Sequence, residues 1–467
     1  MDVSRVPTRV LVVGVLALTA CAGGTSHPAS ASPGPAATSS RAHGPAVARK
    51  KAPAAWPGYH GGVAHRGVSA TMPRAGALQV VARRRLDGAV YASPIAARGV
   101  VVVATENDTV YGLGSGGRTK WRRHLGSPSP QSQRPCGDID PLGITGTPVY
   151  SAATGSVYAV TETRTGGVHH TLVALNILNG KVRWRRSVDF GGVETKAMQQ
   201  RGALTVAGGR VWVTFGGMAG DCGGYKGRLI GVPLRGKGTA VRYTVPTARE
   251  AGMWQPSGPT VDPKDHLLVS VGNGAAESGD RYDRSDSVLQ LSDRARLQQL
   301  FAPTSWASDN AGDVDLGSVG PALVGSRWIV QGGKSDRVYV LRQGHLGGVG
   351  GQVSTATVAP AYGGAAVQGD VVYLPCTDGV RALKVDSTGH LHVLWTSSPA
   401  AAGSPVVGGG RVWILDPSGG TLYAASPSTG KATAHVSVGT TTRFATPALY
   451  GDRVIVPTEA GVTIVRE

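Results

Sequence analysis

The sequence predicts an all-β fold: an eight-bladed β-propeller of four-stranded antiparallel blades, closed by strands from both ends of the chain. The first observation is a repeat. Between Ala89 and Glu467, a small residue at the head, a β-branched run, a tight turn and an aliphatic strand recur eight times. The second is the spacing of the copies, about 40 to 62 residues, which is room for four strands and their loops.

Each repeat unit begins and ends with a similar segment. The heads, usually followed by proline, are Ser93, Thr147, Ala203, Gly258, Gly320, Ala365, Ser404 and Thr446. The tails are the aliphatic strands at 110–113, 172–175, 229–232, 288–291, 338–341, 380–383, 422–425 and 462–465. Seven units continue into a fourth strand, for example at 120–125, 183–188 and 393–395.

The third observation concerns the two ends of the chain. The eighth unit stops at Glu467 without a fourth strand, whereas residues 81–86, upstream of the first unit, resemble one. Pairing these segments would remove two exposed sheet edges, and exposed edges invite aggregation. We therefore expect the last blade to be built from both chain ends.

The N-terminal region predicts export and anchoring. Residues 1–20 combine a weakly basic start with an apolar run that is too short to span a membrane, and Leu18-Thr19-Ala20-Cys21 resembles a bacterial lipobox. The resemblance implies that Cys21 is lipidated and anchors the protein to the extracytoplasmic face of the cell membrane; the alternative is an ordinary secretory signal. Residues 21–55, rich in Ala, Pro and Ser, are expected to be a disordered tether, and residues 56–467 the propeller.

The net charge of +18 and the pI of about 10.1 first suggest a nucleic-acid partner. Extracytoplasmic targeting, the absence of a recognition helix and the lack of interleaved stacking aromatics argue against one. Basic groups at 83–85, 122–123 and 185–186 fall on the fourth strands of neighbouring blades, and 49–51 are also basic. Attraction to anionic headgroups and protection of strand edges both explain this pattern.

Besides Cys21, the chain has three cysteines, which allow at most one bridge within a monomer. Cys136 and Cys222 lie in polar loops on the same side of the expected ring, whereas Cys376 follows a strand and is expected to be buried. We therefore expect a disulfide between Cys136 and Cys222.

The folded part resembles quinoprotein-type propellers. The resemblance rests on Trp56-Pro57-Gly58-Tyr59, His65-Arg66-Gly67 and the turns Asn179-Gly180-Lys181 and Thr429-Gly430-Lys431 before fourth strands, and it covers roughly residues 56–467. It supports the fold more strongly than an activity, because the same repeat occurs in pyrroloquinoline quinone (PQQ) dehydrogenases and in scaffolds without a cofactor.

The resemblance also implies a candidate site for PQQ and Ca²⁺. Trp254 corresponds to the ring beneath the planar cofactor, and Lys334 to the cation at its carbonyl. Asn273, Asp315 and, as a substitute for a glutamate, Asp221 correspond to calcium ligands, and Asp315 also to the catalytic base. Structural roles are the alternatives: Trp254 as a filler between blades, Asn273 as a turn residue and Asp315 as a partner of loop amides.

Departures from the enzyme pattern leave the function open. The chain lacks a vicinal cysteine pair, the tryptophan before the base and a Cys-x-x-Cys-His haem motif. We therefore expect a binding or scaffolding module, with a PQQ- and calcium-dependent dehydrogenase of alcohols or sugars as the alternative. A barrel-assembly scaffold, the role of similar lipoproteins, is a third possibility. The expected partners are membrane lipid, through the anchor, and an envelope protein or electron acceptor; the expected state is a monomer.

Overall fold

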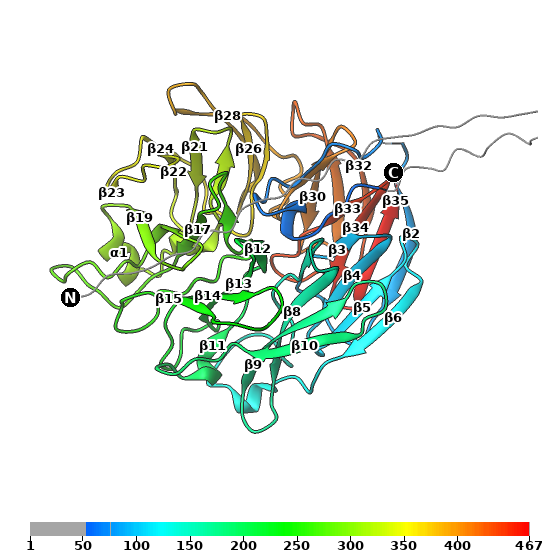
Figure 1. Ribbon diagram of the computed structural model, residues 1–467. Coiled ribbons are helices and arrows are strands. Elements are labelled where there is room, and N and C mark those ends of the chain that lie inside the picture. Colours follow the sequence, from blue (N-terminus) through cyan, green and yellow to red (C-terminus); the bar gives the residue numbers. More distant parts are fainter. Residues whose placement is uncertain (1–52, 75, 467) are drawn as a thin grey trace, which may run out of the picture. The chain divides into compact units, whose positions relative to one another are not determined.

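Each repeat unit folds into one antiparallel sheet, and the eight sheets stand around a common axis as the blades of a propeller (Figure 1). The computed structural model describes residues 53–74 and 76–466. The predicted signal peptide, Cys21, the basic residues 49–51 and the first part of the predicted tether lie outside the described residues. Within them, no helix has the length and hydrophobicity needed to cross a bilayer.

The first four blades follow the order of the repeat, from the inner to the outer strand. Blade 1 consists of β3 (Ile95–Ala97), β4 (Val100–Thr105), β5 (Thr109–Leu113) and β6 (Thr119–His124). Blade 2 consists of β7 (Val149–Ser151), β8 (Ser156–Thr163), β9 (His169–Asn176) and β10 (Val182–Ser187). Blade 3 consists of β12 (Thr205–Ala207), β13 (Arg210–Gly217), β14 (Arg228–Pro233) and β15 (Val241–Thr244), with β11 (Met198–Gln199) on the end of β13. Blade 4 consists of β16 (Thr260–Val261), β17 (Leu267–Val271), β18 (Ser287–Leu291) and β19 (Leu297–Ala302), with β23 (Gly348–Val349) parallel to β19.

The other four blades complete the ring. Blade 5 consists of β20 (Ala322–Val324), β21 (Trp328–Gln331), β22 (Arg337–Arg342) and β24 (Ser354–Thr357). Blade 6 consists of β25 (Ala366–Gln368), β26 (Val371–Cys376), β27 (Gly379–Val385) and β28 (Leu391–Thr396). Blade 7 consists of β29 (Val406–Gly408), β30 (Arg411–Asp416), β31 (Thr421–Ala425) and β32 (Ala432–Ser437), with β1 (Val68–Ser69) parallel to β29. Blade 8 consists of β33 (Ala448–Tyr450), β34 (Arg453–Thr458), β35 (Gly461–Arg466) and β2 (Gln79–Arg85).

Helical segments are short and lie in the connections. They are α1 (Trp306–Ala311) and the 3-10 turns η1 (Tyr59–Gly61), η2 (Gln131–Gln133), η3 (Thr195–Ala197) and η4 (Leu316–Ser318). The fold is therefore all-β, as the sequence predicts.

Burial explains why the second and third strands of each unit are almost continuously aliphatic in the sequence. Every residue of β4 and β5 is buried, because each blade packs against a neighbour on both of its faces. The outer strand β6 instead has a single buried residue, Trp121, whose indole N–H donates to the carbonyl of Ile177 in blade 2, 2.8 Å away. The blades are thus held together by apolar packing inside and, on the outside, by hydrogen bonds from side chains of one blade to backbone carbonyls of the next, which we call clips.

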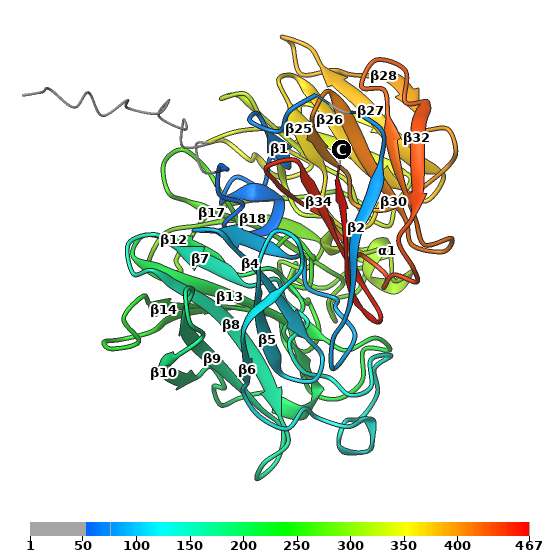
Figure 2. The ribbon, with the colours of Figure 1, turned by 90° about the vertical axis from the view of Figure 1, so that its right-hand side faces the viewer.

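Both chain ends build blade 8, which confirms the predicted closure. β2 pairs antiparallel with β35, for example Ala82 with Ile464 and Arg84 with Val462, and one irregularity lies between Val80 and Ala82. The C-terminus and β2 accordingly lie together in Figure 2. The pairing leaves β35 without an open edge.

Residues 56–69, which we call the N-terminal plug, fill the channel between the inner strands. The backbone of Trp56 exchanges hydrogen bonds of 2.7 and 2.8 Å with Ala96 in blade 1. Further carbonyls of the plug accept N–H groups of blades 2, 4, 6 and 7, from Tyr150, Val261, Val367 and Val407. Trp56 and Tyr59 are each only 2 % exposed, so the plug belongs to the core of the ring.

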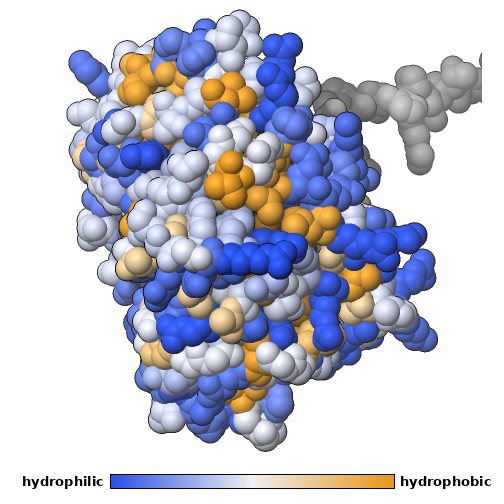
Figure 3. Space-filling view, turned by 90° about the vertical axis from the view of Figure 1, so that its left-hand side faces the viewer, coloured by the Kyte–Doolittle hydropathy of each residue, from blue (hydrophilic) through white to orange (hydrophobic). Residues whose placement is uncertain are grey.

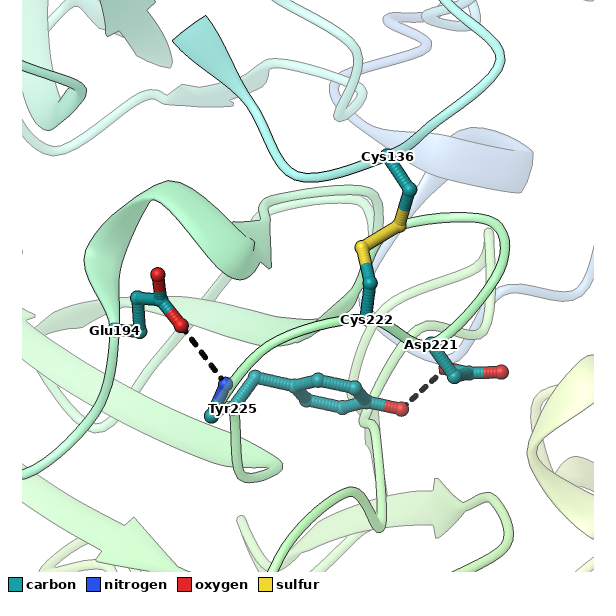
Figure 4. Close-up of a disulfide and its surroundings, with 6 residues drawn as sticks. Cys136, Glu194, Asp221, Cys222 and Tyr225 are labelled. Atoms are coloured by element: carbon teal, nitrogen blue, oxygen red, sulfur yellow. Dashed lines mark hydrogen bonds between the residues drawn. A yellow bond between two sulfur atoms is a disulfide. The ribbon is translucent and has the colours of Figure 1, made fainter.

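A disulfide connects the loop between blades 1 and 2 to the loop that follows β13 in blade 3 (Figure 4). It joins Cys136 to Cys222, the pair expected from the sequence, and Cys376 is a buried free thiol at the end of β26. The blade 3 loop is held further by Glu194, which accepts the backbone N–H of Gly224 at 3.1 Å.

Buried acidic groups lie where blade 1 meets blade 2. Glu106 accepts the backbone N–H of Gly143 at 2.8 Å, whereas neither carboxyl oxygen of Asp108 has a hydrogen-bond partner among the described residues. Burial raises the pKa of Glu106 to about 7, and burial together with the charges of Glu106 and Glu162 raises that of Asp108 to about 9. Burial opposes protonation of His170, but its hydrogen bonds to Asp189 and Glu162 prevail and raise its pKa to about 9.

Deletion of residues 1–88 should lower both the melting temperature and the solubility, because it removes the plug and exposes the edge of β35. Deletion of residues 1–52 keeps both elements and is the matched control, which should melt like the full chain. Scanning calorimetry and light scattering measure the two effects. An unchanged melting temperature after removal of β2 would contradict the closure.

Loss of the disulfide should destabilise the fold by about 2–4 kcal/mol, because the unfolded chain gains entropy. Urea unfolding of Cys136→Ser measures the cost. The double variant Cys136→Ser/Cys222→Ser should cost no more than the single one, since both remove the same bond. In Cys21→Ser protein, thiol labelling after unfolding should find Cys376 alone; three labelled cysteines would reject the bridge.

Stability should fall as the pH rises. The carboxyl of Asp108 has an ordinary pKa of 3.8 in the unfolded chain and about 9 in the fold, so between these values only the folded state keeps its proton. Glu106 and His170 act in the same direction up to about pH 7 and 9. The melting temperature should therefore decrease from pH 5 to pH 9, and Asp108→Asn, which stays neutral, should flatten that decrease. An identical pH profile in the variant would show that Asp108 does not hold the proton.

Candidate functional site

A cavity of about 470 Å³ opens at one end of the propeller axis, and we call it the axial cavity. Most of its lining residues either precede an inner strand or follow a second strand, the two positions at which a blade faces the axis. The polar and aromatic residues of the lining are Tyr91, Asp138, Gln199, Arg201, Asp221, Trp254, Asp313, Asp315, Lys334, Tyr362, Arg443 and Phe444.

Four residues predicted from the sequence, Trp254, Asp221, Asp315 and Lys334, meet in this cavity. A larger hollow of about 580 Å³ lies elsewhere, between turns of blades 5 and 6 around Trp328. We favour the axial cavity as the functional site, because of these two cavities it alone brings several aromatic rings and buried charged groups together.

Lys334, which follows β21, lies between two carboxylates that precede β20. Its ammonium nitrogen is 2.5 Å from Oδ2 of Asp315 and 2.6 Å from Oδ1 of Asp313. Partial burial alone would lower the pKa of Lys334, but Asp315 and Asp313 outweigh it and raise the pKa. Asp315 is 3 % exposed, so its charge is neutralised within the protein.

Asn273 holds Asp315 through hydrogen bonds. Its backbone N–H donates to Oδ1 of Asp315 at 2.8 Å, and its side-chain amide, turned to satisfy both groups, donates to the same carboxylate. A β-carbon at Gly272 would lie 1.9 Å from Oδ1 of Asp315, which explains the glycine. The Gly-Asn pair after β17 therefore positions the aspartate.

Aromatic rings and guanidinium groups form a continuous stack along the cavity wall. Arg201 lies over Phe444 at 4.7 Å and over Tyr91 at 5.7 Å, measured from the guanidinium carbon to the ring centroid. Arg443 also lies over Phe444, at 5.2 Å, and over Tyr362, at 5.4 Å. Such contacts hold planar cations against ring faces. Neither arginine forms an ion pair with an acidic group of the described residues.

Trp254 closes one side of this arrangement. Its ring lies 6.2 Å from that of Phe444, and the ammonium of Lys334 is 5.8 Å from its centroid. Phe444 adopts φ +68°, a left-handed conformation that is uncommon outside glycine and is held here by its neighbours.

Tyr91, Arg201 and Phe444 also line the cavity but were not predicted from the sequence, although a signal existed. All three stand two residues before a repeat head, at Ser93, Ala203 and Thr446. Equivalent repeat positions face equivalent places in a propeller, so the repeat itself indicated that these side chains meet at the axis.

Asp221 lies at the rim of the cavity, next to the disulfide. Its carboxylate accepts the hydroxyl proton of Tyr225, as Figure 4 shows. Asp221 is thus already engaged by a neighbour within blade 3.

The three predicted calcium ligands do not fit a calcium ion as they are arranged. Ca²⁺ takes six to eight oxygen ligands. Here Asp315 binds an ammonium, Asp221 binds Tyr225, and the amide of Asn273 directs its nitrogen to Asp315. No three His, Cys, Asp or Glu side chains of the described chain are grouped closely enough to hold a metal ion.

Three solved structures that share this fold come from two kinds of protein. BamB from Moraxella catarrhalis superimposes with a TM-score of 0.56 at 15% identity, over 84% of this chain and 97% of that one. The quinohemoprotein alcohol dehydrogenase from Comamonas testosteroni gives 0.65 at 17% identity, over 88% and 80%. The quinohemoprotein alcohol dehydrogenase ADHIIG from Pseudomonas putida HK5 gives 0.66 at 13% identity, over 88% and 80%.

At these identities the likeness establishes the fold, a PQQ-type propeller, and no activity. A comparison with curated protein sequences gave no significant match. A family profile described as outer membrane protein assembly factor BamB matches residues 75–225 and 334–467, on both sides of the blades that carry Trp254 and Asp315. The chain therefore belongs to the BamB family of PQQ-like propeller-repeat proteins.

Proposed function

We propose that this protein is an extracytoplasmic propeller lipoprotein, anchored through Cys21, that works as a binding or scaffolding module for another protein of the cell envelope. Support comes from the predicted lipobox, from the family and from the shared fold with M. catarrhalis BamB. The axial cavity is the proposed place of contact with a ligand or partner segment.

The ion-pair cluster of Lys334 with Asp313 and Asp315 carries the argument against metal-dependent redox chemistry. A divalent cation that binds Asp315 would have to displace the ammonium of Lys334, which lies 2.5 Å from the carboxylate. Lys334 would then also lose its contact with Asp313. Calcium would therefore have to compete with an ion pair that already neutralises the buried carboxylate of Asp315. Under this proposal, the ion pairs of Lys334 with Asp313 and Asp315 hold the wall of the cavity in place, and no cofactor is needed.

The alternative is a dehydrogenase that uses PQQ and Ca²⁺, and one observation favours it. Trp254, Asp221, Asp315 and Lys334, all predicted from the quinoprotein resemblance, converge on one cavity with several ring faces for stacking. Under this alternative, Trp254 binds the planar cofactor, and Asp315 is the candidate base once it is released from Lys334.

Calorimetry of the full chain decides between the two functions. We expect no calcium-dependent binding of PQQ at micromolar concentrations, because Lys334 neutralises the carboxylates. Lys334→Gln should then gain calcium affinity, since Asp313 and Asp315 lose their cation. Lys264→Gln, an exposed residue of blade 4, is the control and should change nothing.

Joint binding of PQQ and Ca²⁺ by the unmodified protein would overturn the scaffold proposal. In that case Trp254→Ala should weaken quinone binding by about 1–3 kcal/mol through lost stacking and burial. Asp315→Asn should spare quinone binding and abolish dye reduction if Asp315 is the base.

A further inference from the structure

Positive charge on the outer strands is concentrated on three neighbouring blades. β2, β6 and β10, of blades 8, 1 and 2, each carry three Arg or Lys residues and no Asp or Glu. The outer strands of blades 4 to 7, namely β19, β24, β28 and β32, carry no charged residue at all, and β15 of blade 3 has one, Arg242. We call the surface of β2, β6 and β10 the basic wall.

Protection of strand edges does not explain this asymmetry. Apart from blade 4, where β23 pairs with the end of β19, each blade has an outer edge that is open to other chains, so charges placed for protection would be needed on all of these edges. Three of these open outer strands, β24, β28 and β32, have none.

Clipping of one blade to the next does not explain it either. Arg83, Arg123 and Arg185 do donate to backbone carbonyls of neighbouring blades, those of Ser437, Gly180 and Leu125, at 2.8 to 3.0 Å. Blade 6, however, achieves the same with one neutral ring, since Trp395 donates to the carbonyl of Pro427 at 2.9 Å. Other arginines of the wall, such as Arg85 and Arg183, are exposed and are not needed for clipping.

The basic residues form one continuous surface. Arg84 of β2 lies against the turn before β6, where a β-carbon at Gly117 would be 3.0 Å from its side chain. Arg122 of β6 reaches back to Asp87, just after β2, at 2.7 Å. Arg185 of β10 bonds to the residue after β6. Figure 1 shows the three strands in this order along one stretch of the rim.

Aliphatic side chains are interspersed with the charges. Val81 in β2 and Val182 in β10 are 40 % and 36 % exposed, and Leu178, in the turn before β10, is 50 % exposed. Arginines whose guanidinium groups are fixed at the surface, mixed with exposed aliphatic groups, match the composition of surfaces that lie on anionic bilayers. The side of the molecule with α1 and β23 shows hydrophobic patches scattered among hydrophilic residues (Figure 3).

We propose that the basic wall docks on the anionic headgroups of a lipid membrane. The charges attract the headgroups, and Val81, Leu178 and Val182 enter the interface between headgroups and acyl chains. Docking would hold the propeller on its side, with the axis along the membrane, so that the axial cavity opens parallel to the bilayer. The proposal concerns a different surface from the axial cavity and does not depend on what that cavity binds.

The test uses the full chain with Cys21→Ser, so that no lipid anchor contributes to binding. Sedimentation with vesicles of phosphatidylcholine and phosphatidylglycerol should show binding that weakens with salt, and vesicles of phosphatidylcholine alone should show little. The variant Arg85→Gln/Arg118→Gln/Arg183→Gln removes two exposed charges of the wall, Arg85 and Arg183, and the exposed charge of Arg118, which directly precedes β6. Since each basic residue near an anionic surface strengthens binding about fivefold, this variant should lose on the order of 100-fold in affinity.

The matched control is Lys264→Gln/Arg294→Gln/Arg296→Gln, which removes three exposed charges of blade 4. It should bind within about twofold of the parent, and both variants should melt like the parent. Equal losses in the two variants would show that net charge alone attracts the vesicles and would overturn the proposal. Equal binding to both kinds of vesicle would overturn it too. Binding of soluble polyglutamate without binding to vesicles would assign the wall to an acidic protein instead.

Discussion

The pairing of β2 with β35 is the interaction on which the rest of the structure depends. It joins two segments that are almost 400 residues apart, closes the ring and leaves no blade incomplete. Residues 56–69, which precede β2, bond to the inner strands of five blades as the plug. The same pairing places Arg84 beside blade 1, so the continuity of the basic wall also follows from it.

The axial cavity combines stacked aromatic rings with charged groups that are paired with one another. Trp254, Asp315 and Lys334 all line this cavity. Asp315 and Lys334, however, form an ion pair of 2.5 Å, so the carboxylate of Asp315 is not free for a metal. Arg201 and Arg443 add two cations that are held by rings rather than by carboxylates. The cavity is thus rigid, aromatic and positively charged on one wall, properties that suit recognition.

Much of the site was predictable from the sequence, and the unpredicted part has a definite physical character. The quinoprotein resemblance singled out Trp254, Asp315 and Lys334, and the structure brings them together in one cavity. Arg201 and Phe444 were predictable in another way, because each stands two residues before a repeat head and equivalent repeat positions occupy equivalent places in a propeller. The partner of each charged group was not predictable. Nothing in the sequence around Asp315 indicates whether its carboxylate binds a lysine or a calcium ion.

The sequence by itself determined the eight units, the strand-by-strand order, the closure by residues near 81–86 and the pairing of Cys136 with Cys222. These features depend on local patterns of aliphatic residues, turns and loops, which repeat along the chain. Only the tertiary structure decided that Lys334 neutralises Asp315, that Phe444 stacks between two arginines and that the arginines of three blades share one surface. Such contacts depend on distances of a few ångströms between segments that are far apart in sequence, and the energies of charges and rings change steeply over those distances.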